Sequence, residues 1–361
     1  MPNSNTTKTF KAKVEEFWQW YTDISDDLYE SFETGGFPDI HQHFAGKLEE
    51  LMPKFAWVFG PGPSDIGGHS FTLSAGGEPN HQFLTEYWKS RAPELKGWTF
   101  HASRQPGNLT PEMEFEIAGM KYCFVDAFIS TQVDEESERV NIQFFAQPLA
   151  DAEDNLKHHV MFLMLDEVLG EYGTGQWIND LEFTQAKPDD AISILKLRDV
   201  LHDLELQHGW EKLPPTESGS VYEVPEVAES FARSDTLFGS TVNFSLIAEH
   251  LDSQGETPDL LEGSGADFVY VSFDSSLLPD GGQVDYRANI ADQIGALLEA
   301  EFVGVHLGGA FGAINSYIDF LLFDTARGME IIETSLRQQE LPVGTSIEFF
   351  AKSKRAQSVV L

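Results

Sequence analysis

The sequence predicts an α+β protein with two domains and mostly antiparallel sheets. Its length of 361 residues is more than one domain commonly needs. Apolar residues recur at helical spacing in some segments and alternate with polar residues in others, so both kinds of element are expected. Toward the C-terminus the expected elements follow the order β-α-β-β-α-β, which is typical of a ferredoxin-like domain.

The N-terminal part begins with a predicted helix over residues 8–33, because Phe10, Phe17 and Tyr21 belong to one apolar stripe. Glycine and proline clusters then separate shorter segments, some of them with strand-like alternation. The remaining N-terminal predictions are strands over 55–59, 70–74, 97–103, 112–117, 122–131, 140–146 and 177–183, and helices over 41–52, 80–91 and 151–170.

The C-terminal part has a more regular pattern. It is predicted to contain strands over 268–273, 302–307, 314–323 and 346–350, and helices over 288–301 and 326–338. The glycine-rich stretch 308–312 is predicted to be a turn. Both halves end on two strands, a helix and a strand, with the pairs Gly173-Thr174 and Gly344-Thr345 before or near the last strand. This shared order leaves a distant duplication open.

Composition shifts along the chain suggest the domain boundaries. All seven tryptophans lie at or before Trp210, and the prolines and glutamates of 213–230 are typical of a linker. We therefore predict an N-terminal domain of residues 1–187, a bridging helix and linker of residues 188–234, and a ferredoxin-like domain of residues 235–361.

The formal net charge of −36 excludes several classes of function. Nucleic acids and anionic membrane surfaces repel a chain of this charge, so neither is an expected partner. Cys123 is the only cysteine, so no internal disulfide can form. The polar segment Met1–Lys13 also lacks the apolar centre of a signal peptide. Together these features predict a cytoplasmic protein.

The acidic residues are concentrated in one segment. Between Leu213 and Ala326 only Arg233 and Arg287 are basic, against nineteen acidic residues. Such a segment either keeps the protein soluble or speeds association with a basic partner. The leading hypothesis is a non-enzymatic protein that regulates or sequesters a basic protein partner through this surface. The predicted binding residues are Asp274, Asp280, Asp285, Asp292 and Glu299.

Motifs for chemistry are weak, which favours a non-enzymatic role. No zinc-binding spacing of cysteines and histidines occurs, so no metal and no cofactor is predicted. One alternative is a hydrolase-like enzyme whose site is assembled from scattered residues, and another is a structural subunit of a homo-oligomer. The residues of that scattered site would be His41, His43, His69, His81, His101, Arg104 and Asp126.

Overall fold

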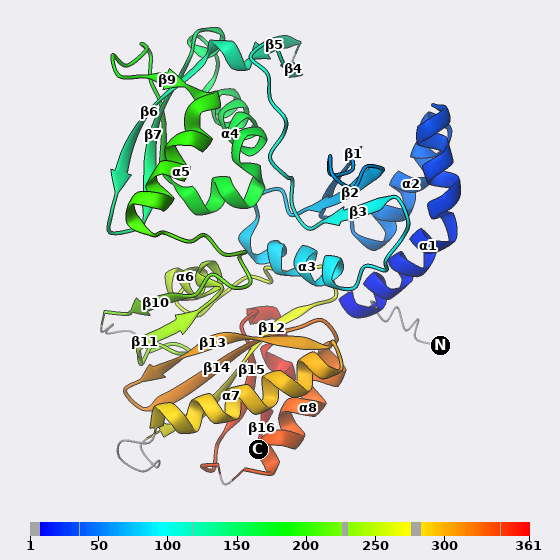
Figure 1. The fold of residues 1–361 in the computed structure, drawn as a ribbon. Coiled ribbons are helices and arrows are strands. Elements are labelled where there is room, and N and C mark those ends of the chain that lie inside the picture. The colour runs from blue at the N-terminus through cyan, green and yellow to red at the C-terminus, as the bar shows by residue number, and fades with distance from the viewer. Residues whose placement is uncertain (1–7, 36, 118, 226–229, 276–282, 340) are drawn as a thin grey trace. The chain divides into compact units, whose positions relative to one another are not determined.

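The computed structural model describes residues 8–35, 37–117, 119–225, 230–275, 283–339 and 341–361 (Figure 1). The chain divides into two compact units, each built from separate stretches of sequence. Unit 1 comprises Met1–Lys54, Pro79–Gly97 and Pro215–Leu361, and unit 2 comprises Phe55–Glu78 and Trp98–Pro214. Helices combined with mostly antiparallel sheets confirm the predicted α+β class.

Unit 1 is built on a seven-stranded sheet in which every described strand pair is antiparallel. The strand order is β10-β11-β13-β14-β12-β15-β16. The strands are β10 (Ser220–Glu223), β11 (Thr236–Thr241), β12 (Asp267–Asp274), β13 (Gly304–Gly312), β14 (Asn315–Leu322), β15 (Ser346–Phe349) and β16 (Val359–Val360).

Two helices cover one face of this sheet, α7 (Gln283–Ala300) and α8 (Thr325–Arg337) (Figure 1). Their apolar stripes are buried against every second residue of the central strands, which is the pattern of a half-buried sheet. This core contains Val269, Val271, Phe273, Ile290, Ile294, Leu298, Ile318, Phe320, Leu322, Ile332 and Ile347. The order of strands and helices predicted for 268–350 agrees with the structure, although α7 begins earlier and β13 ends later than predicted.

Unit 1 also contains the helices α1 (Phe10–Thr34), α2 (Phe37–Leu51), α3 (Pro79–Ser90) and α6 (Phe244–Asp252). The α1 helix begins where the Thr9 side chain accepts a hydrogen bond from the backbone N–H of Ala12. The rings of Trp18 in α1 and Trp88 in α3 are stacked with centroids 4.5 Å apart, and Trp18 donates to the Trp88 carbonyl. The predicted apolar stripe of α1 is thus the face that packs.

Unit 2 contains three smaller sheets, ordered β1-β2-β3, β4-β5 and β8-β7-β6-β9. The helices α4 (Asp154–Trp177) and α5 (Leu197–His208) supply the main core beside the four-stranded sheet. The strands are β1 (Ala56–Pro61), β2 (His69–Ser74), β3 (Trp98–His101), β4 (Glu114–Ile117), β5 (Met120–Cys123), β6 (Ala127–Asp134), β7 (Arg139–Ala146), β8 (Ile178–Phe183) and β9 (Ile192–Ser193).

Some sequence predictions differ from the structure in detail. The predicted strand 122–131 is two strands, β5 and β6, separated by a short 3₁₀ turn. The turn predicted over 308–312 is wrong, because these residues complete β13 between β11 and β14. At Gly309 a Cβ atom would lie 2.2 Å from the Tyr317 carbonyl oxygen, so glycine here permits a close approach of neighbouring chain.

The two halves differ in strand pairing, which argues against a duplication. The β8 strand pairs in parallel with β7, whereas β15 pairs antiparallel with β12. Gly173-Thr174 lies within α4, whereas Gly344-Thr345 precedes β15. The predicted boundaries at residues 187 and 235 stay a prediction. The two compact units have other boundaries than the predicted domains, and β10 of unit 1 lies within the predicted linker.

Candidate functional site: the α7 face and the β13 cavity

Arg233 and Arg287, the two basic residues of the acidic segment, both contact other residues within unit 1. Arg233 donates two hydrogen bonds to Asp319, at 2.6 and 3.2 Å, and both side chains are buried. Arg287 donates to the Tyr317 carbonyl, and its guanidinium lies 4.3 Å from the centroid of the Phe311 ring. Neither cation is therefore directed toward the acidic surface that the sequence predicts.

The basic cluster near the C-terminus also finds its partners within unit 1. Arg355 forms an ion pair with Glu256 at 3.0 Å, and Lys352 pairs with the same carboxylate. Lys354 lies 2.7 Å from Asp259 and also pairs with Asp267. Hydrogen bonds from Lys352 and Arg355 lower the pKa of Glu256. Three carboxylates of the acidic segment 213–326 are therefore neutralised by this basic cluster within unit 1.

Three of the predicted binding residues remain outside this compensation. Asp285, Asp292 and Glu299 are spaced seven residues apart on α7 and are all exposed. Seven residues are nearly two helical turns, so the three carboxylates share one side of the helix at intervals of about 10 Å. Within the described part of the chain, none of the three has an ion-pair or hydrogen-bond partner for its carboxylate. We call these three residues the acidic face of α7.

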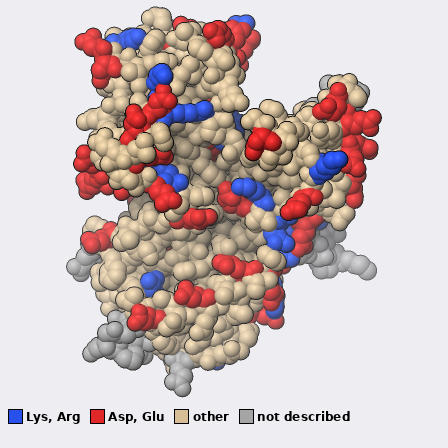
Figure 2. Space-filling view, in the orientation of Figure 1, with Lys and Arg blue, Asp and Glu red and all other residues tan. Residues whose placement is uncertain are grey.

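Figure 2 shows separated acidic side chains over the region of α7, on a mostly uncharged surface with one basic patch nearby. The opposite side of the helix is buried through Ile290, Ile294 and Leu298. The predicted residue Asp274 lies elsewhere, at the end of β12 opposite Asn315. Asp280 lies outside the described residues. The structure thus brings together three of the five predicted residues on one helix.

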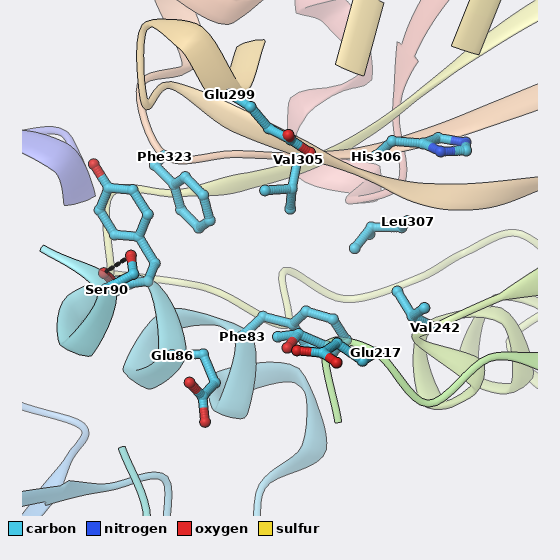
Figure 3. A pocket seen from close by; sticks show the side chains of 12 residues that line it. Phe83, Glu86, Ser90, Glu217, Val242, Glu299, Val305, His306, Leu307 and Phe323 are labelled. Carbon is cyan, nitrogen blue, oxygen red and sulfur yellow. Dashed lines mark hydrogen bonds between the residues drawn. The ribbon is translucent and has the colours of Figure 1, made fainter. Parts of the chain in front are cut away.

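A cavity of 370 Å³ lies beside the last turn of α7, and Glu299 is part of its wall (Figure 3). Its position follows from the pairing of β13. The β11 strand pairs with β13 only over Gly308–Gly312, whereas β14 runs along the whole strand. The part of β13 that β11 does not pair with lines the cavity through Val305, His306 and Leu307. We call it the β13 cavity; it is lined by Phe83, Glu86, Tyr87, Ser90, Thr216, Glu217, Val242, Glu299, Val305, His306, Leu307 and Phe323.

The α3 helix closes one side of the β13 cavity. The Tyr87 hydroxyl donates to the Phe302 carbonyl at 2.9 Å, and the Tyr87 ring stacks on Phe323 with centroids 3.8 Å apart. Burial raises the pKa of Tyr87, so its hydroxyl stays protonated and neutral. Phe83 from the same helix is buried as well. Phe83 and Tyr87 therefore form the apolar part of this side of the cavity.

The charged side chains that line the cavity are all negative. Glu86, Glu217 and Glu299 come from three different elements, and no lysine or arginine is among the described residues of the wall. Burial lowers the pKa of His306, and its Nε2 donates to the Gly308 carbonyl at 2.8 Å, so this ring is neutral. In Figure 3 the Glu299 carboxylate points toward Val305, whereas the His306 ring and the Glu86 carboxylate point away from it.

The sequence did not indicate Glu86 or Glu217 as site residues. Glu86 lies on a helix that the sequence places in the N-terminal domain, far along the chain from Glu299. The sequence does contain a pattern here, because Phe83 and Tyr87 are four residues apart and share a helix face with Glu86 between them in sequence. Only the three-dimensional packing of α3 within unit 1 connects that pattern to α7.

The alternative site of scattered histidines is not gathered by the strands that carry it. His69 pairs with Trp98, and His101 lies three residues beyond Trp98 on β3, so the two histidines are on opposite faces of their sheet. His41, His43 and His81 belong to unit 1, whereas Arg104 and Asp126 belong to unit 2. The described residues contain no group of three or more potential metal ligands.

Comparisons with known proteins leave the geometry as the only guide to function. No family model, no curated protein and no solved structure matches the chain. Among the described helices, none combines the length and apolar content that crossing a bilayer requires. The functional argument therefore begins from the acidic face of α7 and the β13 cavity.

Proposed function

We propose that this chain is a non-enzymatic binding protein that captures or regulates a basic protein partner through the acidic face of α7. One observation carries the proposal. Asp285, Asp292 and Glu299 share an exposed helix face without ion-pair partners among the described residues, while Glu256 and Asp319 of the same segment are paired. Exposed carboxylates of this kind attract a positively charged surface and raise its association rate.

The proposed setting is the cytoplasm, on the basis of the single cysteine. For the fold, we further propose that residues 267–349 form a ferredoxin-like domain. The supporting observations are the element order β12-α7-β13-β14-α8-β15 and the strand order β13-β14-β12-β15. In that arrangement α7 is the first crossover helix, and its outer side is free to meet a partner.

The test compares partner capture by the native chain and by a variant with Asp285→Asn, Asp292→Asn and Glu299→Gln. Each exposed ion pair contributes about 0.2–1 kcal/mol, so losing three should weaken capture about tenfold at low salt. The measurement is quantitative capture from lysate of the native cell, at low and high ionic strength, with the captured proteins identified by mass spectrometry.

The matched control neutralises three exposed carboxylates elsewhere in unit 1, with Asp26→Asn, Glu30→Gln and Glu49→Gln. It changes the net charge by the same amount but leaves α7 intact, so it should retain most of the capture. Equal losses in both variants would mean that only the overall charge matters, and unchanged capture in the α7 variant would reject this face as the binding site.

A further inference from the structure

The shape of the β13 cavity suits one long side chain better than a flat surface contact. Its volume of 370 Å³ is at the small end of the range for ligand sites. Much of the wall is apolar, with Phe83, Tyr87, Leu307 and Phe323 all buried. An occupant must therefore place aliphatic or aromatic groups against this wall and leave any polar group at the carboxylates.

The charge of the wall selects a cation. Glu217 and Glu299 are exposed, and their carboxylates have no hydrogen-bond or ion-pair partner within the described residues. His306 is neutral, and the described residues of the wall include no lysine or arginine, so nothing among them compensates these charges. An anionic or neutral occupant would leave both charges uncompensated, whereas a cation is attracted by both.

The distribution of the carboxylates favours an ammonium group over a guanidinium. Elsewhere in unit 1, Arg233 presents its planar guanidinium to the single carboxylate of Asp319 through two hydrogen bonds. The Lys354 ammonium instead pairs with two carboxylates, those of Asp259 and Asp267. In the β13 cavity the carboxylates belong to separate elements, the loop at 217 and the last turn of α7. A compact ammonium with three donors on an aliphatic stem fits separate acceptors beside an apolar wall.

We propose that the β13 cavity receives a lysine side chain of the basic protein partner, with its stem against Phe83, Val305 and Leu307 and its ammonium between the carboxylates of Glu217 and Glu299. This proposal rests on the proposed function, because the lysine belongs to the basic protein partner proposed there. It adds a specific anchor to a surface whose other charges, Asp285 and Asp292, lie along the same helix. A buried anchor surrounded by a charged periphery is the usual organisation of a selective interface.

The test uses the full chain and a defined small molecule, Nα-acetyl-lysine N-methylamide, titrated at millimolar concentrations and followed by NMR or calorimetry. The norleucine analogue keeps the stem without the charge, and the arginine analogue replaces the ammonium with a guanidinium. We expect the lysine analogue to bind about tenfold more tightly than either of these. No binding of the lysine analogue, equal binding of the norleucine analogue, or tighter binding of the arginine analogue would each overturn the proposal.

Two variants examine the parts of the site separately. Glu217→Gln with Glu299→Gln removes the ion pairs and should weaken binding of the lysine analogue about tenfold. Thr216→Trp fills the cavity from a partly exposed loop position, keeps every carboxylate and should abolish binding. Glu262→Gln, an exposed carboxylate outside the cavity, is the matched control and should bind as the native chain does.

The outcomes separate this proposal from the proposed function. If a partner is captured through α7 but the lysine analogue does not bind, the cavity assignment is wrong and the proposed function stands. If the lysine analogue binds and Thr216→Trp abolishes that binding, but no partner is captured, the cavity takes a free amine and the proposed function is wrong.

Discussion

Unit 1 and unit 2 stabilise a buried carboxylate in different ways. Asp319 in unit 1 is 1% exposed and Glu171 in unit 2 is 3% exposed, so both have lost nearly all contact with solvent. Asp319 is paired with the cation of Arg233. Glu171 instead accepts hydrogen bonds from the Ser74 hydroxyl and from the backbone N–H groups of Gly77 and Arg104.

The surroundings of each carboxylate favour its own partners, a cation for Asp319 and backbone N–H groups for Glu171. In unit 1, the Arg233 guanidinium lies 4.7 to 5.1 Å from the ring centroids of Tyr270, Tyr317 and Phe350, which favour a cation at their faces. In unit 2, α4 is interrupted at Gly170, whose φ of 77° and ψ of 162° turn the chain toward Arg104. A Cβ atom at Gly170 would lie 3.0 Å from the Arg104 carbonyl oxygen, so glycine is required there.

The comparison also helps to separate structural carboxylates from binding ones. Asp319 and Glu171 are buried and fully satisfied by the protein itself. Asp285, Asp292 and Glu299 are exposed and have no such partners among the described residues. The first group should matter for the free energy of unfolding and the second for association.

The largest effect is expected for Asp319→Asn. The substitution leaves the Arg233 cation buried without a counter-charge, which costs about 3–5 kcal/mol. Urea denaturation followed by circular dichroism should show this loss in the free energy of unfolding of unit 1. Glu262→Gln, an exposed carboxylate of the same unit, should change that free energy by less than about 0.5 kcal/mol.

A double variant shows whether the pairing itself causes the loss. Arg233→Met combined with Asp319→Leu removes both charges, and apolar groups that fill the same space can replace a buried ion pair at little cost. We expect the double variant to be more stable than Asp319→Asn alone. Additive losses from the two sites would instead show that shape, and not charge, governs this part of the sheet.

Four of the seven strands of the C-terminal sheet, β12 to β15, could be predicted from sequence because their signals are local. Alternating apolar residues mark β12 and β14, and the stripe of α8 repeats at helical spacing. The Arg233–Asp319 pair could not be predicted in the same way. Its members are 86 residues apart, and their contact depends on β11, β13 and β14 lying side by side. The turn predicted at 308–312 failed for a related reason, since neighbouring strands overrode the weak strand preference of glycine.

The second prediction concerns His250, which packs beside the same ion pair. Its Nε2 donates to the Ala232 carbonyl and its Nδ1 accepts from the Thr257 hydroxyl, so the ring is neutral. Burial, aided by the charge of Arg233, lowers the pKa of His250 from 6.5 to about 4. The unfolded chain therefore binds a proton at higher pH than the folded one. Stability from this residue is complete above pH 6.5 and is lost as the pH falls from 6.5 to about 4.

The expected loss is roughly 3 kcal/mol across that window. His250→Gln keeps one donor and one acceptor but does not titrate. The difference in the free energy of unfolding between native chain and variant, measured from pH 7.5 to about pH 4, isolates the histidine from the carboxylates. A difference that does not change with pH would mean that His250 titrates normally in the folded protein.

The site was only partly predictable for a physical reason. Residues on one helix share a face by simple periodicity, so Asp292 and Glu299 could be grouped from the helix predicted over 288–301. Asp285 joins them only because α7 begins earlier, at Gln283. A cavity, in contrast, depends on how elements that are distant in sequence pack together. No local sequence pattern predicts the residue at which β11 stops pairing with β13. Glu86 and Glu217 therefore appeared only with the structure.

The smallest of these effects is expected for Glu171→Gln in unit 2. Both oxygens of Glu171 accept hydrogen bonds, at 2.8 Å from Ser74, 3.0 Å from Gly77 and 3.2 Å from Arg104. A glutamine offers one acceptor in place of two, so at least one backbone N–H must face an amide N–H. An unsatisfied buried donor costs about 1–3 kcal/mol. This loss should appear in the unfolding of unit 2 and leave the transition of unit 1 unchanged.

Glu136→Gln, an exposed position in the β6–β7 hairpin of the same unit, is the matched control and should have little effect. The deciding measurement compares the loss of unfolding free energy in Glu171→Gln with that in Asp319→Asn. Removing the charge of Glu171 leaves no buried cation behind, because its partners are a hydroxyl and two backbone amides. Its cost should therefore stay below that of Asp319→Asn. An equal or larger loss would imply that the interruption of α4 at Gly170 depends on the negative charge itself, and that unit 2 relies on electrostatics as strongly as unit 1 does.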